Sequence, residues 1–308
     1  MSVSIWFWVA FHVGVFAALA VDLFSDRTHD RISLPSAARR SLLWVGLSLS
    51  FNSLVWWWQG ADQAIDFFTG YLIEYSLSVD NIFVFGLIFA FFRVPPRYEH
   101  RVLIWGIVGA LLMRAVMIWL GITLVSQFHF VLYLFGAFLV ITGLRMFGGK
   151  SQPIDLEGNF VLRTIRRLMP VTNDYHGPKF IALVRGRRML TPLALVLIVI
   201  ETTDLLFAVD SIPAVLAITR DAFIVYTSNI CAILGLRSLY FLLANLLTRF
   251  IHLRLGLAII LCFVGSKMLA EPWVRMPSWL SLVVILSILA ITTIASLRST
   301  GGDTTPAA

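Results

Sequence analysis

The sequence predicts an all-α protein that crosses a membrane many times. Hydrophobic residues make up 59% of the 308 residues and charged residues only 13%, which is not typical of a soluble domain. The apolar residues gather in runs of about 20, the length that crosses a bilayer as a helix. We expect about nine transmembrane helices, at 4–23, 41–58, 67–92, 101–125, 129–148, 191–218, 222–248, 253–271 and 278–297.

These runs are interpreted as one membrane domain of residues 1–308. We expect the first run to be retained rather than cleaved as a signal peptide, because Met1 to Phe11 contains no Lys or Arg. The parts of the domain are a first repeat at 67–148, a basic loop at 149–190, a second repeat at 191–271, a last span at 278–297 and a disordered tail at 300–308.

Basic residues gather in alternate loops. The formal net charge of +7 is therefore spread along the chain in a way that argues against nucleic acid as a partner. By the positive-inside rule, the N-terminus lies outside and the C-terminus in the cytoplasm of a bacterial inner (plasma) membrane. The strongly basic loop at 149–190 is open to three interpretations: a linker, a lipid-facing segment or a docking site for a partner.

Three motifs recur in the same order along the chain. By the loop charges, the third and sixth spans enter the membrane from opposite sides. This pattern predicts an inverted repeat of three plus three helices, which in many transporters places the binding site at the repeat interface. The matched pairs are Glu74-x5-Asp80-Asn81 with Asp204-x5-Asp210-Ser211, Gly109-x4-Arg114 with Ala232-x4-Arg237, and Gly143-x-x-Met146 with Gly265-x-x-Met268.

The repeated acidic stretches form the candidate site. A charged side chain at the bilayer centre costs about 2.5 to 3.5 kcal/mol on insertion scales, so acids there indicate function. Their oxygen donors suit Mn, Mg or Ca, whereas Zn, Cu(I) and Ni favour imidazole or thiolate. We expect a divalent cation as the transported substrate and no organic cofactor. The candidate ligands are Glu74, Asp80, Asn81, Glu201, Asp204 and Asp210, and Ser211 is a supporting residue next to Asp210.

Helix geometry complicates this picture. At 100° per residue, Asp80 lies about 120° around the helix from Glu74, and Asp210 lies equally far from Asp204. An intact helix therefore does not direct both acids of one span to one point. Pro213 lacks a backbone N–H, so we expect an unwound turn at 209–212 that swings Asp210 inward.

Two arginines within the spans need partners. We interpret Arg114 and Arg237 as ion-pair struts that support the site. Asp22, at the inner end of the first span, fits either a gating role or a simple interfacial charge. Glu201 is open to a structural reading, because its counterpart in the first repeat is Tyr71.

Two functions remain open on these residues. The first is alternating-access transport of a divalent cation in exchange for protons. The second is a membrane-assembly or partner-docking protein whose buried acids are structural and neutralised by the arginines. We expect no enzyme, since an intramembrane aspartyl protease carries Gly-x-Gly-Asp where this chain has Phe207-Ala-Val-Asp210. Cys231 and Cys262 are expected to be buried thiols without a metal or disulfide role.

At these motifs the sequence resembles the TerC family of integral membrane proteins, and its Alx-type members in particular. The resemblance implies a multi-pass plasma-membrane protein linked to manganese export, with metal binding at Glu74, Asp80, Asn81, Asp204 and Asp210. One departure is Tyr75, where many members carry Lys. The residues themselves leave open the choice among Mn, Mg and Ca, the direction, the coupling ion and the oligomeric state. The motifs that carry the resemblance are Gly70–Asn81, Phe207–Ala214 and Ala232–Arg237.

Overall fold

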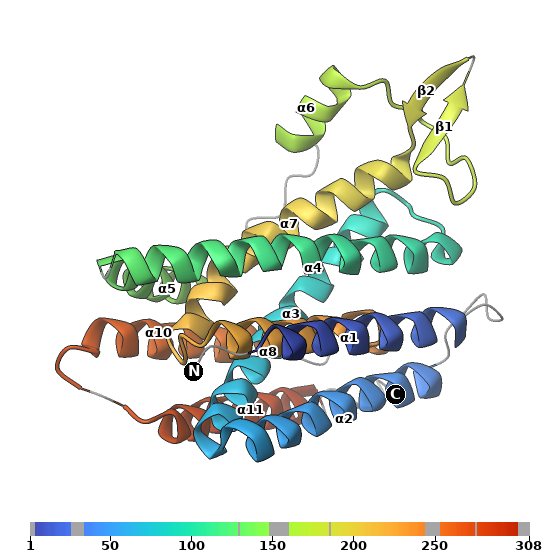
Figure 1. Cartoon of the computed structure of the whole chain (residues 1–308). Helices are drawn as coiled ribbons and strands as arrows, with labels where there is room; N and C mark the ends of the chain where they lie inside the picture. Colours follow the sequence, from blue (N-terminus) through green and yellow to red (C-terminus); the bar gives the residue numbers. More distant parts are fainter. Residues whose placement is uncertain are drawn as a thin grey trace, which may run out of the picture.

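The computed structural model is a bundle of helices with a small appendage (Figure 1). It describes residues 4–25, 34–128, 130–147, 160–184, 186–243, 253–274 and 276–300. The elements are α1 (Ile5–Ser25), α2 (Leu34–Gln59), α3 (Ala61–Phe91), α4 (Pro96–Gln127), α5 (Phe130–Phe147), α6 (Phe160–Leu168), β1 (Ile181–Val184), β2 (Arg187–Leu190), α7 (Pro192–Leu216), α8 (Ala222–Leu234), α9 (Leu236–Leu243), α10 (Leu253–Ala270) and α11 (Ser278–Thr300).

The structure has several apolar helices, as a multi-pass membrane protein requires. Seven stretches among the described residues are long and apolar enough to cross a bilayer. A further apolar helix, Leu255–Ala270, is shorter, and α2 is long enough but is not among the seven, since its Ser, Asn and Gln residues dilute its apolar run. The expected count of nine spans is therefore not confirmed. The seven are Ile5–Asp22, Ala61–Phe91, Pro96–Gln127, Phe130–Phe147, Pro192–Leu216, Ala222–Leu242 and Ser278–Ser296.

The expected unwound turn at 209–212 is wrong, because α7 runs unbroken through Pro213 to Leu216. Pro213 cannot donate to the Val209 carbonyl, yet the helix continues past this missing hydrogen bond. The Pro213 carbonyl still accepts the Ala217 N–H at 3.0 Å. A break is found instead after α8, where Gly235 separates this helix from α9.

The basic loop is partly structured and adds one short hairpin to a mostly helical protein. Strands β1 and β2 form an antiparallel hairpin in which Ile181 pairs with Leu190. Gly186 in the turn has φ of 77°, a conformation that favours glycine. Helix α6 and the hairpin extend from one end of the bundle (Figure 1). Residues 149–159 and 185 of the loop and 301–308 of the expected disordered tail lie outside the described residues, while Thr300 ends α11.

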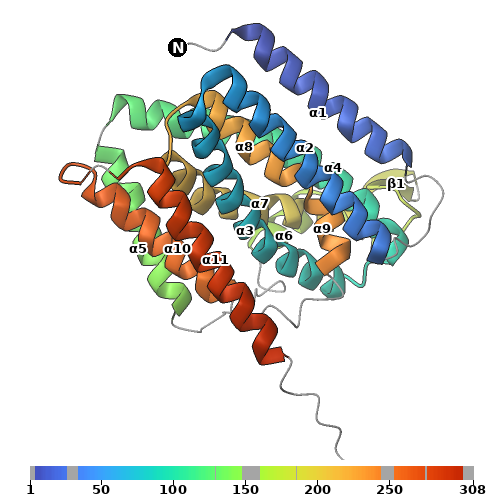
Figure 2. The ribbon, with the colours of Figure 1, turned by 90° about the horizontal axis from the view of Figure 1, so that it is seen from below.

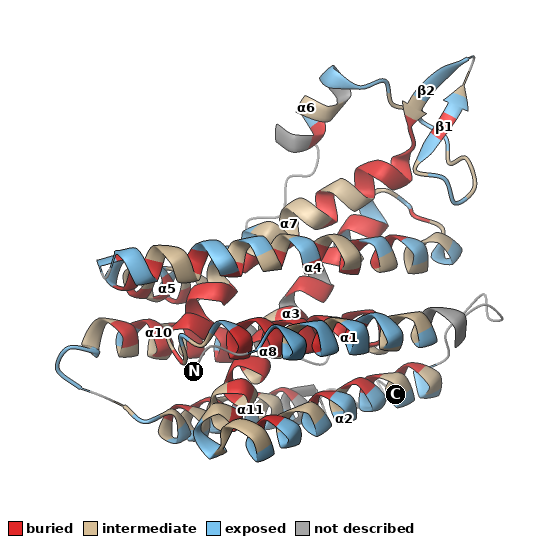
Figure 3. Cartoon of the chain, in the orientation of Figure 1, coloured by how far each residue is buried: buried red, intermediate tan, exposed pale blue. Residues whose placement is uncertain are grey.

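Four helices pack crosswise at the centre of the bundle. Helix α3 packs on α8 and α4 packs on α7, while α3 also contacts α7. We call α3, α4 and α5 the first triplet and α7, α8 and α10 the second. The first helix of each triplet therefore packs on the second helix of the other triplet. A pseudo-twofold repeat would produce this pairing, although the inverted repeat itself remains a prediction. Buried residues concentrate on α7 and α8, as the red segments in Figure 3 show.

The third helices of the two triplets, α5 and α10, pack closely side by side (Figure 2). Their contact is lined by glycines at matched positions of the two motifs. A Cβ at Gly143 would lie 2.5 Å from the Cys262 Sγ and 2.8 Å from the Ala258 carbonyl oxygen, and one at Gly265 would lie 2.6 Å from the Gly136 carbonyl oxygen. Small residues are what allow two membrane helices to approach this closely.

We predict that Gly143→Ala destabilises the protein by about 1 to 3 kcal/mol, because the new methyl group meets backbone that cannot move cheaply. Gly46→Ala is the matched control, since a Cβ there meets nothing within 4 Å and the helix gains up to about 1 kcal/mol. Thermal unfolding in detergent measures both. Equal midpoints for the two variants would contradict this packing.

Candidate functional site

A buried arginine joins the two repeated acidic stretches. Arg114 of α4 is fully buried, and its Nη1 donates to the Glu74 carboxylate of α3. Its Nε and Nη2 donate to both carboxylate oxygens of Asp204 of α7, at 3.2 and 3.1 Å. Glu74 and Asp204 occupy equivalent positions in the two motifs, so one guanidinium holds the matched pair together.

Two neutral side chains complete the cluster. The Asn229 Oδ1 of α8 accepts from Arg114 Nη1 at 3.1 Å, and its Nδ2 donates to Glu74 Oε2 at 2.8 Å. The Ser211 Oγ lies 3.4 Å from Arg114 Nη1. The four central helices thus each supply a side chain to one network, which we call the Arg114 cluster: Glu74, Arg114, Asp204, Ser211 and Asn229.

The Arg114 cluster carries more negative than positive charge when ionised. It contains two carboxylates and one guanidinium, all nearly inaccessible to solvent. A buried ion loses its hydration and must be compensated by its neighbours. With both acids ionised, the cluster therefore keeps one negative charge that its own guanidinium does not compensate.

Glu201 lies one helical turn before Asp204 and faces α4. A Cβ on Gly109 would overlap the Glu201 carboxylate, so glycine is what lets this acid approach the helix. Both acids border a cavity of about 20 Å³ that is also lined by Arg237. That volume is enough for one water molecule, but the cavity wall is almost entirely apolar.

Asp210 is not part of the cluster. It is half-buried on α7, and its Oδ1 accepts a long hydrogen bond of 3.5 Å from Thr142 Oγ1 of α5. Since α7 stays helical here, Asp210 faces a different neighbour from Asp204, as an intact helix predicts. The expectation that it swings inward is therefore wrong in this conformation.

The remaining candidates on α3 are only partly described. The side chain of Asp80 lies outside the described residues. Asn81 is buried, at 2% exposure. Ser78, which shares the face of Glu74, is fully buried, and its hydroxyl has no hydrogen-bond partner among the described residues. This face thus carries an oxygen that is available to a ligand.

Arg237 has a different role from its repeat counterpart. It lies on α9, where its Nη2 donates to Asp22 Oδ2 of α1 at 2.5 Å and its Nη1 donates to His100 Nδ1 of α4 at 3.2 Å. The Asp22 Oδ1 also lies 3.8 Å from the Arg40 Nη1 of α2. Both arginines are in ion pairs, as expected, but Arg237 fastens α1 to the bundle.

No group of three or more His, Cys, Asp or Glu that could hold a metal occurs in the described part of the chain. Between Glu74 and Asp204 lies the guanidinium of Arg114. An internal cation therefore stands between two of the expected ligands of the predicted cation site.

Sequence reasoning missed three contacts of the site. The partners Thr142 and His100 come from helices whose packing the sequence does not reveal. The role of Gly109 had a signal, because this glycine opens the repeated motif that ends at Arg114.

Comparisons with known proteins agree with this architecture. Residues 59–303 match the family model described as integral membrane protein TerC family. An uncharacterised membrane protein of Myxococcus xanthus is 46% identical over 292 residues, covering 94% of this chain and 91% of its own. Proteins of Salmonella typhi and Escherichia coli K12, provisionally named membrane-bound redox modulator Alx, are each 44% identical over 295 residues, with 92% of both chains covered. No solved structure matches the chain.

We predict that Arg114→Met destabilises the protein more than Asp204→Asn or Glu74→Gln does. Removing the arginine leaves two buried carboxylates without the cation they share, a loss of about 3 to 5 kcal/mol. Removing either acid leaves a neutral pair. Thermal unfolding midpoints in one detergent rank the three variants, and an Arg114→Met protein as stable as the parent would refute the charge assignment.

Proposed function

Since this chain belongs to the TerC family of integral membrane proteins, we propose that it is a transporter that exports a divalent metal cation, Mn²⁺, by alternating access in exchange for protons. The observation that carries the proposal is the convergence of Glu74 and Asp204 on one buried positive charge. Two acids from separate spans meet at mid-bundle, where carboxylates are expensive unless a cation compensates them.

The chemistry around the cluster suits a hard cation. Besides the two carboxylates, Ser211 and Asn229 contribute oxygens, and the hydroxyl of Ser78 lies one turn from Glu74. Oxygen donors of this kind bind Mn, Mg and Ca. In the proposed cycle Arg114 is the resident counter-ion, and the metal displaces its guanidinium from the carboxylates when the site opens.

Proton exchange follows from the charge of the cluster. With Arg114 in place, the two ionised carboxylates leave one negative charge uncompensated. A proton that binds as the metal leaves supplies the missing positive charge, and its release prepares the site for the next metal ion. Glu201 borders the small cavity beside Asp204 and is proposed to pass that proton.

We place the transporter in the bacterial inner membrane, with the N-terminus outside and the C-terminus in the cytoplasm. The support is the alternation of basic and acidic loops, with four arginines between the first two apolar runs and two aspartates in the next loop. In this orientation the Asp22–Arg237 pair lies toward the cytoplasm, where the exported ion enters.

A second candidate is a membrane-assembly or docking protein in which the buried ion pairs are structural. The observation that favours it is the complete pairing of Glu74 and Asp204 with Arg114. Deleting residues within the basic loop separates the two functions. A transporter is expected to keep its ion flux after the deletion, whereas a docking protein that uses the loop is expected to lose its activity.

We predict that reconstituted protein exchanges labelled Mn²⁺ against unlabelled Mn²⁺ across proteoliposomes, and that Asp204→Asn and Glu74→Gln each lower the rate at least about tenfold, the equivalent of 1.4 kcal/mol. Either change removes a ligand and one charge of the site. Excess Mg²⁺ and Ca²⁺ as competitors rank the three ions, and an imposed pH gradient tests proton coupling.

Glu271→Gln is the matched control for the loss of one carboxylate, since Glu271 forms an exposed pair with Arg220 at 2.7 Å that contributes little. It is expected to exchange Mn²⁺ like the parent. Folded Asp204→Asn protein that exchanges Mn²⁺ at the parental rate would overturn the proposal.

A further inference from the structure

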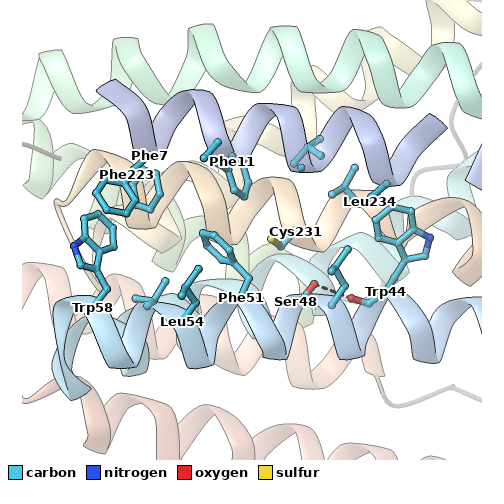
Figure 4. A pocket seen from close by; sticks show the side chains of 16 residues that line it. Phe7, Phe11, Trp44, Ser48, Phe51, Leu54, Trp58, Phe223, Cys231 and Leu234 are labelled. Atoms are coloured by element: carbon cyan, nitrogen blue, oxygen red, sulfur yellow. Dashed lines mark hydrogen bonds between the residues drawn. The ribbon is translucent and has the colours of Figure 1, made fainter. Parts of the chain in front are cut away.

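An apolar cavity of about 270 Å³ lies between α1 and α2, against α8 (Figure 4). Aromatic and aliphatic side chains from all three helices face it, as the sticks in Figure 4 show. The hydroxyl of Ser48 also lies at the wall, but it donates to the Trp44 carbonyl at 2.9 Å. The cavity therefore offers a guest almost only hydrocarbon surface. Its lining includes Phe7, Phe11, Leu47, Phe51, Trp58 and Phe223.

Helix α1 is held at three points that keep this space open. The Phe7 ring stacks on Trp58 with centroids 3.7 Å apart, at one end of the helix. The His12 Nε2 lies 2.9 Å from the Tyr226 hydroxyl near the middle, and Asp22 binds Arg237 at the other end. Figure 2 shows α1 at the edge of the bundle, beside α2 and α8. The chain's own side chains thus fasten α1 without filling the gap.

A second cavity, of about 350 Å³, continues the first toward the Asp22 end of α1. The two cavities share the lining residues Ala18, Trp44 and Leu47. The second differs in charge, since Arg39 and Arg40 line it together with Asp22. Arg39 is exposed, whereas Arg40 pairs with Asp22, so Arg39 gives the lining its excess of positive charge.

The length of the apolar cavity is close to that of one acyl chain. From Phe7 to Ala18, α1 extends about 17 Å at 1.5 Å per residue. Each acyl chain covers half of the hydrocarbon core of a bilayer, or about 15 Å. The basic cavity at one end and the apolar cavity at the other therefore match the headgroup and one acyl chain of a lipid that lies along α1.

We propose that these two cavities together bind one anionic phospholipid, with an acyl chain between α1 and α2 and the phosphate beside Arg39 and Arg40. An acyl chain restores the packing contacts that an empty apolar cavity lacks. Guanidinium groups match the geometry of phosphate oxygens, and basic residues at the membrane surface favour anionic lipids. The lipid completes the attachment of α1, at a site separate from the Arg114 cluster.

The test compares phosphatidylglycerol with phosphatidylcholine, added to delipidated protein and counted by native mass spectrometry. We expect one tightly retained phosphatidylglycerol per chain and a preference for it over phosphatidylcholine. Arg39→Gln is expected to reduce that preference about fivefold, since one basic residue is removed from the headgroup end. Gly14→Leu is expected to abolish retention of either lipid, because a Cβ at Gly14 meets nothing within 4 Å and a larger side chain fills the cavity.

Matched controls exist for both variants. Arg145→Gln removes an exposed arginine from the last turn of α5, and Gly46→Leu adds the same bulk to α2 at a position with nothing within 4 Å. Both are expected to retain phosphatidylglycerol like the parent, and added phosphatidylglycerol should raise the unfolding midpoint of the parent but not that of Gly14→Leu. Equal retention of the two lipids by the parent, or full retention by Gly14→Leu, would overturn the proposal.

Discussion

The contact of one guanidinium with two carboxylates, Arg114 with Glu74 and Asp204, is the constraint on which the centre of this protein depends. The free-energy cost of burying either acid without a partner would be too high here, and the same holds for the arginine. Together they require α3, α4 and α7 to meet in one arrangement, and Asn229 brings α8 to the same point. The same contacts therefore determine both the crosswise packing of the four helices and the position of the Arg114 cluster.

The same contacts leave the cluster with an excess of negative charge when both acids are ionised. A bidentate pair with Asp204 and a contact with Glu74 fix the guanidinium, but the ionised acids still exceed it by one charge. A divalent cation that displaces Arg114 would balance the two carboxylates, and a proton would supply the missing positive charge when the guanidinium returns. Arg237, the repeat counterpart of Arg114, does not join two acids of the site. It pairs with Asp22 near the edge of the bundle and holds α1 instead.

Much of this arrangement could be predicted from the sequence. The register of the two acidic motifs placed Glu74 opposite Asp204, and the depth of Arg114 required that it be paired. The orientation of Asp210 could not be predicted, because it depends on whether α7 continues through Pro213, and the hydrogen bond from Thr142 depends on how α5 packs. The expected count of nine spans is not confirmed, and α2 is one reason, because its polar residues weaken its apolar run. The hairpin of β1 and β2 was missed, since its strands have only four residues each.

The most direct test of the central claim is the affinity of purified protein for Mn²⁺, measured from the loss of the free-ion signal in electron paramagnetic resonance. If Arg114 occupies the place of the cation, Arg114→Gln protein binds Mn²⁺ at least about tenfold more tightly than the parent, or 1.4 kcal/mol. Adding Asp204→Asn to that variant abolishes the gain. Equal binding by the parent and Arg114→Gln, or a gain that survives Asp204→Asn, would contradict the account.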